Sequence, residues 1–489
     1  MKQIQDVYSK NNLPIKVVQF GEGRLLRALI EPAFQKAVNE KRFEGSVAIV
    51  KPTGRGNLAS FQQQNCLYTV VLRGKQGGKA LDEAFPITCV DRAVNPYEDF
   101  EAFLALARLP ELEFVISNTT EAGIVLDPED RFDAAPPHSF PGKLTRFLYE
   151  RYQYSKGSEK CGLTILPTEL IERNGDRLKD CVLRLAEIWN LEQPFCTWIE
   201  KTCLFCSTLV DRIVSGCSQE ELPSLWERFG YRDELVTVGE PFGMWAIEAP
   251  EQVSVRLPID GPGSPAFFVR DLTPWKQRKV RILNGGHTAM VPASFLAGKN
   301  LVRECMDDPA IQRFLTKTEE EEIVPYVPLP HKDALEFSHE IEQRFANPFL
   351  DHQLLDICVN SFAKWKERIL PSVLDSYRVG KLPRRLIFSF AALLAFYTKA
   401  EEKEGELFGQ RGDQFYRLHE SPRILALVKE SSGLSADAYV KAVLRESGLF
   451  EELETLPQFA YLAAADLQRI REQGAAAAMA AVTESRNEQ

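Results

Sequence analysis

Ile15-Lys-Val-Val-Gln-Phe20-Gly21-Glu22-Gly23 is the stretch that decides the fold of this chain. Its first six residues are mostly apolar or β-branched, which predicts a short buried strand. A Gly-X-Gly turn directly after a first strand is typical of the phosphate-binding fingerprint of dinucleotide-binding domains, although it also fits a plain tight turn. Leu26 replaces the third glycine of that fingerprint, and Pro32 predicts that the next helix begins late, near Ile30.

The pattern beyond this turn predicts a change of architecture along the chain. β-rich runs alternate with amphipathic segments as far as residue 248, and long helical patterns dominate afterwards, apart from two expected strands at 253–257 and 267–269. We therefore predict an α/β N-terminal domain, a Rossmann-type doubly wound sheet, at residues 1–248. A mainly α-helical C-terminal domain is expected at residues 249–489. The expected strands of the first domain are 15–20, 46–50, 68–72, 114–117 and 163–166.

Composition narrows the class of protein. A chain of 489 residues is long enough for two cores. Its net charge of -10 argues against a nucleic-acid partner. No apolar run is long enough for a membrane span, and the polar N-terminus lacks a signal-peptide core. Ten scattered cysteines, including the pair Cys203 and Cys206, indicate reduced thiols and a cytoplasmic location. That pair lacks the partners of a zinc site, so we expect it to be structural.

The stretch Lys279-Val-Arg-Ile-Leu-Asn284-Gly-Gly-His287 carries candidate chemistry. On a helix, spacings of three and eight residues fall near one face, so these polar side chains can converge. A buried lysine can act as a base near neutral pH, an amide can donate to a developing oxyanion, and an imidazole can orient the substrate. This is the equipment of hydride transfer without a metal. A helix with a solvated lysine and a core histidine is the alternative.

Polar residues at two further strand ends fit a dinucleotide. Arg24 or Arg27 could hold a pyrophosphate beside exposed backbone N–H groups. Ser117-Asn-Thr-Thr-Glu121 follows a strand, where it would face the nicotinamide ribose, unless it is an ordinary polar turn. The second strand ends at Lys51 without the acidic residue usual for NAD, and Lys51 and Arg55 would tolerate a 2′-phosphate. The choice between NAD and NADP stays open.

Taken together, these motifs resemble the polyol-specific long-chain dehydrogenases, which include the mannitol dehydrogenases and hexuronate reductases. The resemblance rests on four stretches that occur in the family's order and span most of the chain. Thr120-Glu-Ala-Gly-Ile124 and Asn284-Gly-Gly-His287-Thr-Ala-Met-Val-Pro292 resemble the branch that interconverts tagaturonate and altronate. The four stretches are Gln19-Phe-Gly-Glu-Gly23 with Arg27, Ser117-Asn-Thr-Thr-Glu121-Ala-Gly123, Val210-Asp-Arg212-Ile, and Lys279 to His287.

The resemblance implies an NAD-dependent enzyme without a metal, with a Rossmann domain and a helical C-terminal domain. It implies Lys279 as the catalytic base, Asn284 as an oxyanion donor and His287 as a group that orients the substrate. Substrate contacts are expected from Asp211, Lys276, His352, Lys364 and Arg368, and a solvated helix face is the alternative for the last three. Cofactor contacts are expected from Val18, Gln19, Phe20, Gly21, Glu22, Gly23, Arg24, Leu25, Leu26, Arg27, Ser117, Asn118, Thr119 and Glu121.

Two positions depart from the family pattern. Lys276 stands where mannitol dehydrogenases have a glutamate three residues before the base, and Leu170 stands where they have an asparagine. Both changes fit a substrate that carries its own carboxylate, because Lys276 adds positive charge beside Lys279. A fructuronate reductase or a mannitol-type polyol dehydrogenase is the alternative within the family. A nucleotide-sensing protein without catalysis is the alternative of another class, and both a monomer and a dimer remain open.

Overall fold

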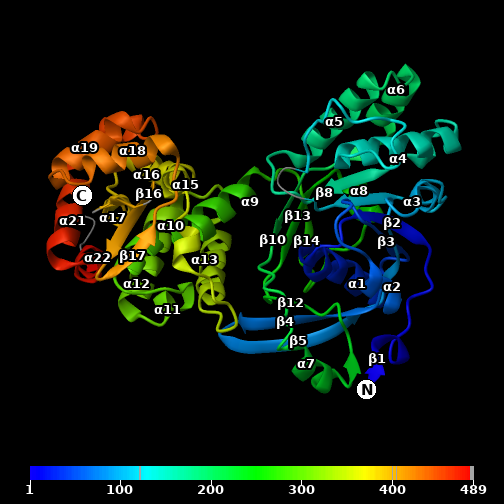
Figure 1. Ribbon diagram of the computed structural model, residues 1–489, viewed down its shortest axis with the longest axis horizontal. Helices are drawn as coiled ribbons and strands as arrows, with labels where there is room; N and C mark the ends of the chain where they lie inside the picture. The colour runs from blue at the N-terminus through cyan, green and yellow to red at the C-terminus, as the bar shows by residue number, and fades with distance from the viewer. Residues whose placement is uncertain (120–122, 399, 404, 485–489) are drawn as a thin grey trace. The chain divides into compact units, whose positions relative to one another are not determined.

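The computed structural model describes residues 1–119, 123–398, 400–403 and 405–484, which form two compact units (Figure 1). The first unit comprises Met1–Gly74 and Ala80–Leu272, and the second comprises Lys75–Lys79 and Thr273–Gln489. The units divide after Leu272, whereas the sequence pattern placed a boundary after residue 248. Strands β13 (Met244–Glu248) and β14 (Ala266–Val269) pair with each other, which keeps this stretch in the first unit.

A six-stranded parallel sheet forms the centre of the first unit, in the order β6-β3-β2-β7-β8-β9. Counted along the chain, this is the 3-2-1-4-5-6 order of a Rossmann fold, so the predicted doubly wound sheet is confirmed. Three of its strands, β2, β3 and β7, are almost entirely buried, as expected where helices cover both faces of a parallel sheet. The strands are β2 (Ile15–Phe20), β3 (Ser46–Val50), β6 (Val90–Val94), β7 (Phe114–Ser117), β8 (Thr164–Pro167) and β9 (Leu204–Phe205).

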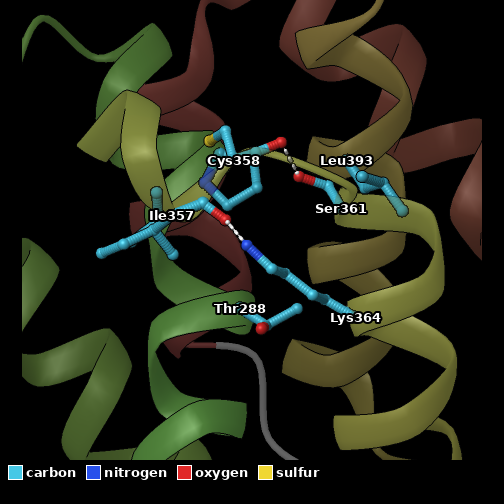
Figure 2. Close-up of a pocket in the computed structure, with 8 residues that line it drawn as sticks. Thr288, Ile357, Cys358, Ser361, Lys364 and Leu393 are labelled. Carbon is cyan, nitrogen blue, oxygen red and sulfur yellow. Dashed lines mark hydrogen bonds between the residues drawn. The ribbon is translucent and has the colours of Figure 1, made fainter. Parts of the chain in front are cut away.

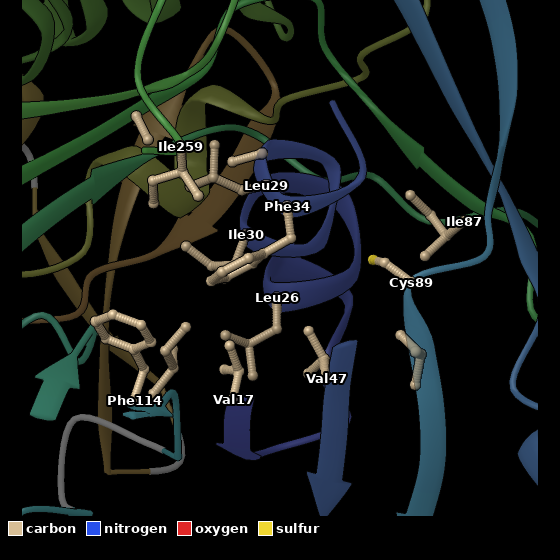
Figure 3. Packing of buried hydrophobic residues seen from close by; sticks show 14 of the residues in the cluster. Val17, Leu26, Leu29, Ile30, Phe34, Val47, Ile87, Cys89, Phe114 and Ile259 are labelled. Carbon is tan, nitrogen blue, oxygen red and sulfur yellow. The ribbon is translucent and has the colours of Figure 1, made fainter. Parts of the chain in front are cut away.

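Helix α1 (Glu31–Asn39) covers one face of this sheet, as Figure 3 shows. It begins one residue before Pro32, close to the predicted start. A π-helical turn, η2 (Leu26–Ile30), precedes it and was not predicted. Leu26, Leu29 and Ile30 from this turn pack with strand residues in one buried cluster. The wider turn lets the chain enter the helix directly after the glycine loop although Pro32 lacks an N–H.

Helices and smaller sheets complete the first unit. β10 (Thr208–Asp211), β13 and β14 form one sheet, and β12 (Thr237–Gly239), β4 (Tyr68–Gln76) and β5 (Lys79–Ile87) form another. The short strands β1 (Lys2–Gln3) and β11 (Tyr231–Arg232) pair in parallel. The remaining helical elements are η1 (Ile4–Asp6), α2 (Ala59–Gln63), α3 (Phe100–Ala107), α4 (Phe140–Ser155), η3 (Glu159–Cys161), α5 (Asn174–Ile188), α6 (Gln193–Thr202), α7 (Leu222–Phe229) and α8 (Glu251–Arg256).

One predicted strand of this region is wrong. Residues 253–257 alternate apolar and polar side chains, but they belong to helix α8 and the turn that follows it. Val253 is fully buried, whereas Val255 is 75% exposed, so the alternation does not mark a sheet face. Pro250 precedes the helix as its N-cap, and α8 then forms a single amphipathic segment. The other expected strand is confirmed by β14.

The second unit is mainly helical, as predicted. Helix α17 (Arg384–Phe396) is buried along almost its whole length and packs against α10 (Gly285–Leu296) and α21 (Phe459–Gln473). The other elements are α9 (Thr273–Arg278), η4 (Lys279–Asn284), α11 (Val302–Met306), α12 (Pro309–Thr318), η5 (Glu319–Ile323), η6 (Val324–Tyr326), α13 (His331–Phe345), α14 (Leu354–Ile357), α15 (Ser361–Arg368), α16 (Leu370–Arg378), β15 (Glu401–Lys403), β16 (Glu406–Arg411), β17 (Gln414–Arg417), α18 (Pro422–Ser431), α19 (Ala436–Glu446), α20 (Glu451–Glu454) and α22 (Ala475–Glu484).

None of the helices in the described part of the chain has the length and apolar character needed to cross a membrane.

Candidate functional site

The loop after β2 has the geometry of a phosphate-binding turn. Gly21 has a φ of 130°, and a Cβ there would lie 2.7 Å from Leu26 Cδ1 and 2.8 Å from Asn118 O. Only glycine fits such a position. At Gly23, by contrast, a Cβ would meet no atom within 4 Å, and both Gly23 and Arg24 are exposed. The backbone of this turn is therefore open to an approaching anion.

A buried hydrogen-bond network supports this loop from behind. The Gln19 amide donates to Gly21 O (2.9 Å) and to Glu31 Oε1 (2.7 Å), and the Tyr68 hydroxyl donates to the other carboxyl oxygen of Glu31. Burial raises the pKa of Glu31, while the hydrogen bonds from Tyr68 and Gln19 and the charge of Arg27 oppose that shift. The network fixes the direction of the Gly21 carbonyl, so Gln19 acts on the loop through its side chain.

The structure separates the two arginines of the loop. Arg27 donates to Leu235 O at 2.7 Å and faces the rings of Phe61 and Tyr68, and burial lowers its pKa. Its guanidinium is part of the packing behind the loop. Arg24 is exposed, so it is the better candidate for a phosphate contact.

Four other predicted cofactor residues are apolar. Val18, Phe20 and Leu26 are fully buried, and Leu25 packs against the same core as Leu26. Their side chains hold the strand and the helical turn in place. Any contact with a nucleotide from these positions would involve the backbone.

The end of β7 is bound to the end of β8 by a buried carboxyl group that the sequence pattern did not reveal. Glu169 accepts hydrogen bonds from Ser117 Oγ, Thr119 N and Thr119 Oγ1, each at 3.0 Å. Asn118 donates to Thr168 Oγ1 at 3.1 Å. Burial raises the pKa of Glu169, whereas these hydrogen bonds oppose the shift. Glu169 therefore holds the predicted Ser117–Thr119 turn, and no local pattern could have indicated this long-range contact.

Two further predicted residues, Glu121 and Asp211, fall within the sequence range of the first unit. Glu121 lies outside the described residues. Asp211 is the last residue of β10 and is buried. The neighbouring Arg212 donates to Phe242 O at 2.7 Å and to Pro241 O at 3.0 Å, which fixes the chain beyond Asp211.

In the second unit, Lys279 and Asn284 begin and end the π-helical turn η4. Five residues along an α-helix lie about 140° apart, so an ordinary helix would turn these two side chains to different faces. The π turn closes over five residues, as the hydrogen bond from Gly285 N–H to Val280 O shows. In such a turn, residues five apart lie nearer to one face than they do in an α-helix, so the positions of Lys279 and Asn284 are compatible with a shared site. Such turns occur frequently at functional sites.

His287 follows one turn later on α10 and is enclosed. Its ring stacks on Phe345, with centroids 3.9 Å apart and planes at 15°, and meets the His352 ring edge-on at 5.4 Å. Its Nε2 atom is buried without a hydrogen-bond partner among the described residues. Burial lowers the pKa of His287 well below its usual value, and nearby cations lower it further. The imidazole is therefore neutral near pH 7 and has one ring nitrogen available.

Four basic side chains lower the pKa of His287, namely His352, Arg368, Arg344 and Lys364. Three of them were predicted as substrate residues, and the structure brings them around His287. Arg368 donates to Thr288 Oγ1 at 3.3 Å, and burial lowers its pKa. The fourth, Arg344 on α13, was missed, since nothing in its local sequence indicates the contact. Such a group of like charges favours an anionic ligand.

The remaining predicted substrate residue, Lys276, lies on α9, three residues before Lys279. It has an intermediate exposure. Leu170, the other departure from the family pattern, is 56% exposed just beyond β8.

A second carboxyl group that the sequence did not reveal lies behind the predicted catalytic stretch. Glu319, the first residue of η5, is fully buried, and neither of its carboxyl oxygens has a partner among the described residues. A Cβ on Gly286 would lie 2.3 Å from Glu319 Oε1. Burial raises the pKa of Glu319 well above its usual value, and the charges of Glu342 and Glu320 add to the shift. Glu319 is therefore a buried carboxyl group packed against Gly286, in a setting that disfavours its charged form.

A narrow pocket lies beside Thr288 and Lys364 (Figure 2). Lys364 crosses it and donates to Ile357 O at 2.9 Å. Its free volume is about 10 Å³, the lower limit for one water molecule. This pocket is too small for a sugar, so it is not a substrate site; it is the space that the Lys364 side chain crosses.

Within the described residues, no three His, Cys, Asp or Glu side chains lie close enough together to hold a metal ion. Cys203 and Cys206 are buried, and burial raises the pKa of their thiols to about 11 and about 12. These thiols are poorly reactive, as expected for structural cysteines.

Two family models match this chain. The mannitol dehydrogenase Rossmann domain matches residues 15–261, and the mannitol dehydrogenase C-terminal domain matches residues 271–471. An altronate oxidoreductase of Yersinia enterocolitica is 40% identical over 471 residues, which cover 96% of this chain and 97% of that protein. An altronate oxidoreductase of Bacillus subtilis is 40% identical over 401 residues, which cover 82% of this chain and 83% of that protein.

Solved structures agree with the fold. A D-sorbitol dehydrogenase in substrate-free form superposes with a TM-score of 0.80 at 21% identity, covering 97% of this chain and 96% of that one. The Pseudomonas fluorescens mannitol 2-dehydrogenase, in a ternary complex with NAD and D-mannitol, superposes with a TM-score of 0.68 at 20% identity, covering 98% of this chain and 96% of that one. At these identities the likeness shows the fold.

Proposed function

The chain belongs to the mannitol dehydrogenase family, and from that premise we propose that it is an NAD-dependent oxidoreductase that interconverts D-tagaturonate and D-altronate. The family makes it an oxidoreductase acting on CH–OH groups. The observation that carries the choice of sugar acid is the similarity to altronate oxidoreductases, at 40% identity along nearly the whole of both chains. Neutral-polyol dehydrogenases match the fold at about half that identity.

The reaction needs a hydride acceptor and a base. Oxidation of the altronate alcohol breaks a C–H bond, whose electron pair leaves with the hydrogen, and an O–H bond, whose proton leaves to a base, as the C=O bond forms. A bound NAD would supply the hydride acceptor, at the site formed by the loop after β2 and the end of β7. Lys279 is proposed to take the hydroxyl proton. Reduction of tagaturonate runs through the same steps in reverse.

Asn284 and His287 complete the proposed machinery. The π turn that begins at Lys279 and ends at Asn284 supports a joint action on one oxygen atom: the base removes its proton and the amide donates to the negative charge that develops. His287, neutral and held between Phe345 and His352, offers its unpartnered Nε2 to a substrate hydroxyl. No metal is assigned to this mechanism.

Basic side chains of the second unit are proposed to bind the sugar acid's carboxylate. His352, Lys364 and Arg368 surround His287, and burial lowers the pKa of each. A bound carboxylate would relieve the repulsion within this group. Lys276 is proposed as a further carboxylate contact, and Asp211 of the first unit as a contact with substrate hydroxyls.

The residues of the first unit fit a dinucleotide. The open backbone at Gly23, with Arg24 exposed beside it, supports a pyrophosphate contact. Ser117, Asn118 and Thr119, held by Glu169, are proposed to contact the nicotinamide half. A cytoplasmic location is proposed from the unpaired cysteines.

Steady-state reduction assays with NADH test the proposal. Purified protein would be supplied with D-tagaturonate, D-fructuronate and D-fructose at matched concentrations. We expect the highest kcat/KM with tagaturonate and the lowest with fructose, which lacks a carboxylate. A preference for fructose would contradict the sugar-acid assignment, and a preference for fructuronate would move the protein to the other hexuronate branch.

A further inference from the structure

The carboxylate of Glu22 and the ammonium group of Lys51 form an ion pair at the nucleotide edge of the sheet. Glu22 is the middle residue of the Gly21-Glu22-Gly23 turn, and Lys51 directly follows β3. Their Nζ and Oε1 atoms lie 3.2 Å apart. A residue of the loop after the first strand of the fold therefore reaches across to the end of the second strand.

In a doubly wound sheet, this edge is where a dinucleotide binds. The loop after the first strand approaches the pyrophosphate, and an acidic residue at the end of the second strand accepts hydrogen bonds from the adenosine ribose. The chain has Lys51-Pro52-Thr53 at that strand end and no acid. The ion pair brings the carboxylate of Glu22 to the place where the sequence lacks one.

Lys51 is buried and its polar contacts are intramolecular. Its side chain is 1% exposed, and Nζ donates to Glu22, to Arg55 O and, at 3.5 Å, to Thr53 Oγ1. A buried ammonium group needs such partners, because an uncompensated charge in the interior is costly. Lys51 is therefore committed to holding Glu22 and the turn at Thr53 and Arg55.

Glu22, in contrast, remains accessible. Its side chain is 29% exposed, and a carboxylate has several acceptor positions, so the pair with Lys51 leaves capacity for further hydrogen bonds. Two ribose hydroxyls would satisfy that capacity. The 2′-phosphate of NADP carries a charge of about −2 and would lie next to the carboxylate of Glu22. Like charges in contact are strongly disfavoured.

We propose that Glu22, positioned by Lys51, selects NAD(H) over NADP(H) by accepting hydrogen bonds from the adenosine ribose and repelling a 2′-phosphate. The inference rests on the dinucleotide binding of the proposed function, but it does not depend on which sugar is the substrate. An unpaired lysine at this position would favour the 2′-phosphate of NADP(H). Because the charge of Lys51 is already paired with Glu22, we expect Lys51 to favour NAD(H) by holding that carboxylate in place.

Arg55 is the residue that would support the opposite preference. It is exposed in the same turn, and a guanidinium there could bind a 2′-phosphate. Glu22 is therefore expected to weaken NADPH binding, whereas Arg55 would strengthen it. Glu22→Gln removes the carboxylate with little change in shape, and Arg55→Ala removes the competing cation.

Dissociation constants for NADH and NADPH, measured from nucleotide fluorescence without any sugar, test the proposal directly. Glu113→Gln is a matched control, because Glu113 pairs with Lys16 at 3.3 Å, with similar side-chain exposure, at the opposite end of the same sheet. Thermal unfolding of each variant would show that the fold is retained. Lys51→Met, which frees Glu22, tests the positioning role.

We expect the parent to bind NADH at least about tenfold more tightly than NADPH, since like-charge contacts cost several kcal/mol. Glu22→Gln should reduce this ratio at least tenfold, mainly by tightening NADPH, whereas Glu113→Gln and Arg55→Ala should leave the preference for NADH in place. Lys51→Met should lower the ratio by weakening NADH. Equal affinities in the parent, or an unchanged ratio in Glu22→Gln, would overturn the proposal. Loss of binding to both nucleotides in the folded parent would instead refute the proposed function.

Discussion

Gly286→Ala is the most informative single change to the stretch proposed to carry catalysis. The added Cβ would lie 2.3 Å from Glu319 Oε1 and 3.2 Å from Leu315 Cδ1. To reach 3.4 Å, where ordinary contact begins, the carboxyl group must move by about 1 Å. Glu319 is fully buried, so its carboxyl group has no open space to enter.

Two opposing terms set the expected free energy of unfolding. Overpacking of a buried site costs about 1–3 kcal/mol. Replacing glycine by alanine within a helix stabilises it by about 1 kcal/mol. We therefore expect Gly286→Ala to destabilise the protein by about 0–2 kcal/mol. In a Glu319→Ala background the clash with the carboxyl group disappears and only the 3.2 Å contact with the end of the Leu315 side chain remains, so the same change should stabilise by up to about 1 kcal/mol.

Urea denaturation of the two single variants and the double variant gives the coupling energy between these positions. We expect about 1–3 kcal/mol, which is the steric cost alone. Gly285→Ala serves as the control, because its Cβ would first meet Arg368 O at 3.3 Å and does not approach Glu319. Its coupling to Glu319→Ala should be near zero. Additivity of Gly286→Ala and Glu319→Ala within about 0.5 kcal/mol would refute this account of why residue 286 lacks a side chain.

Three further predictions concern charge, metal and pH. Lys276→Glu should raise the KM for altronate at least about tenfold, which corresponds to about 1.4 kcal/mol of lost attraction. The KM for a neutral polyol should stay unchanged. Equal losses on both substrates would limit Lys276 to a structural role. EDTA should leave turnover unchanged, and activity that returned only on adding zinc would disprove a metal-free mechanism. Because the folded state lowers the pKa of His287 below its unfolded value near 6.5, the unfolded chain binds the extra proton, so stability should fall as the pH drops below 6.5. The slope in urea titrations should flatten in His287→Asn but not in the exposed His339→Asn, and an equal slope in the parent and His287→Asn would contradict the burial argument.

The sequence predicted the central sheet well because its strands are continuous apolar runs. β2, β3 and β7 have the predicted bounds, and their order follows from alternating strands and helices. Residues 253–257 were assigned to a strand because alternation in a short segment cannot be distinguished from one helical turn with a single buried side. The helical pattern of the C-terminal part likewise does not reveal the break between α14 and α15, where Asn360 adopts a left-handed conformation with φ 54°.

The candidate site was predictable only where its residues are close in sequence. Lys279, Asn284 and His287 form one local pattern, but the π turn between the first two has no simple sequence signal. Glu319 approaches this stretch from a distant turn. Lys51 illustrates the limit most clearly, because its sequence position suggests a phosphate ligand, whereas its burial and its contact with Glu22 indicate the opposite.

The role of Lys279 is the central claim, and turnover of Lys279→Ala measured beside its NADH affinity tests it most directly. A base acts in proton transfer and commonly contributes about 10² to 10⁴ in rate. We therefore expect kcat with tagaturonate to fall at least about a hundredfold, while the dissociation constant for NADH, set by residues of the first unit, stays within about threefold. Unchanged turnover would contradict the assignment of Lys279 as the base, and a parallel loss of NADH binding would show that its role is structural.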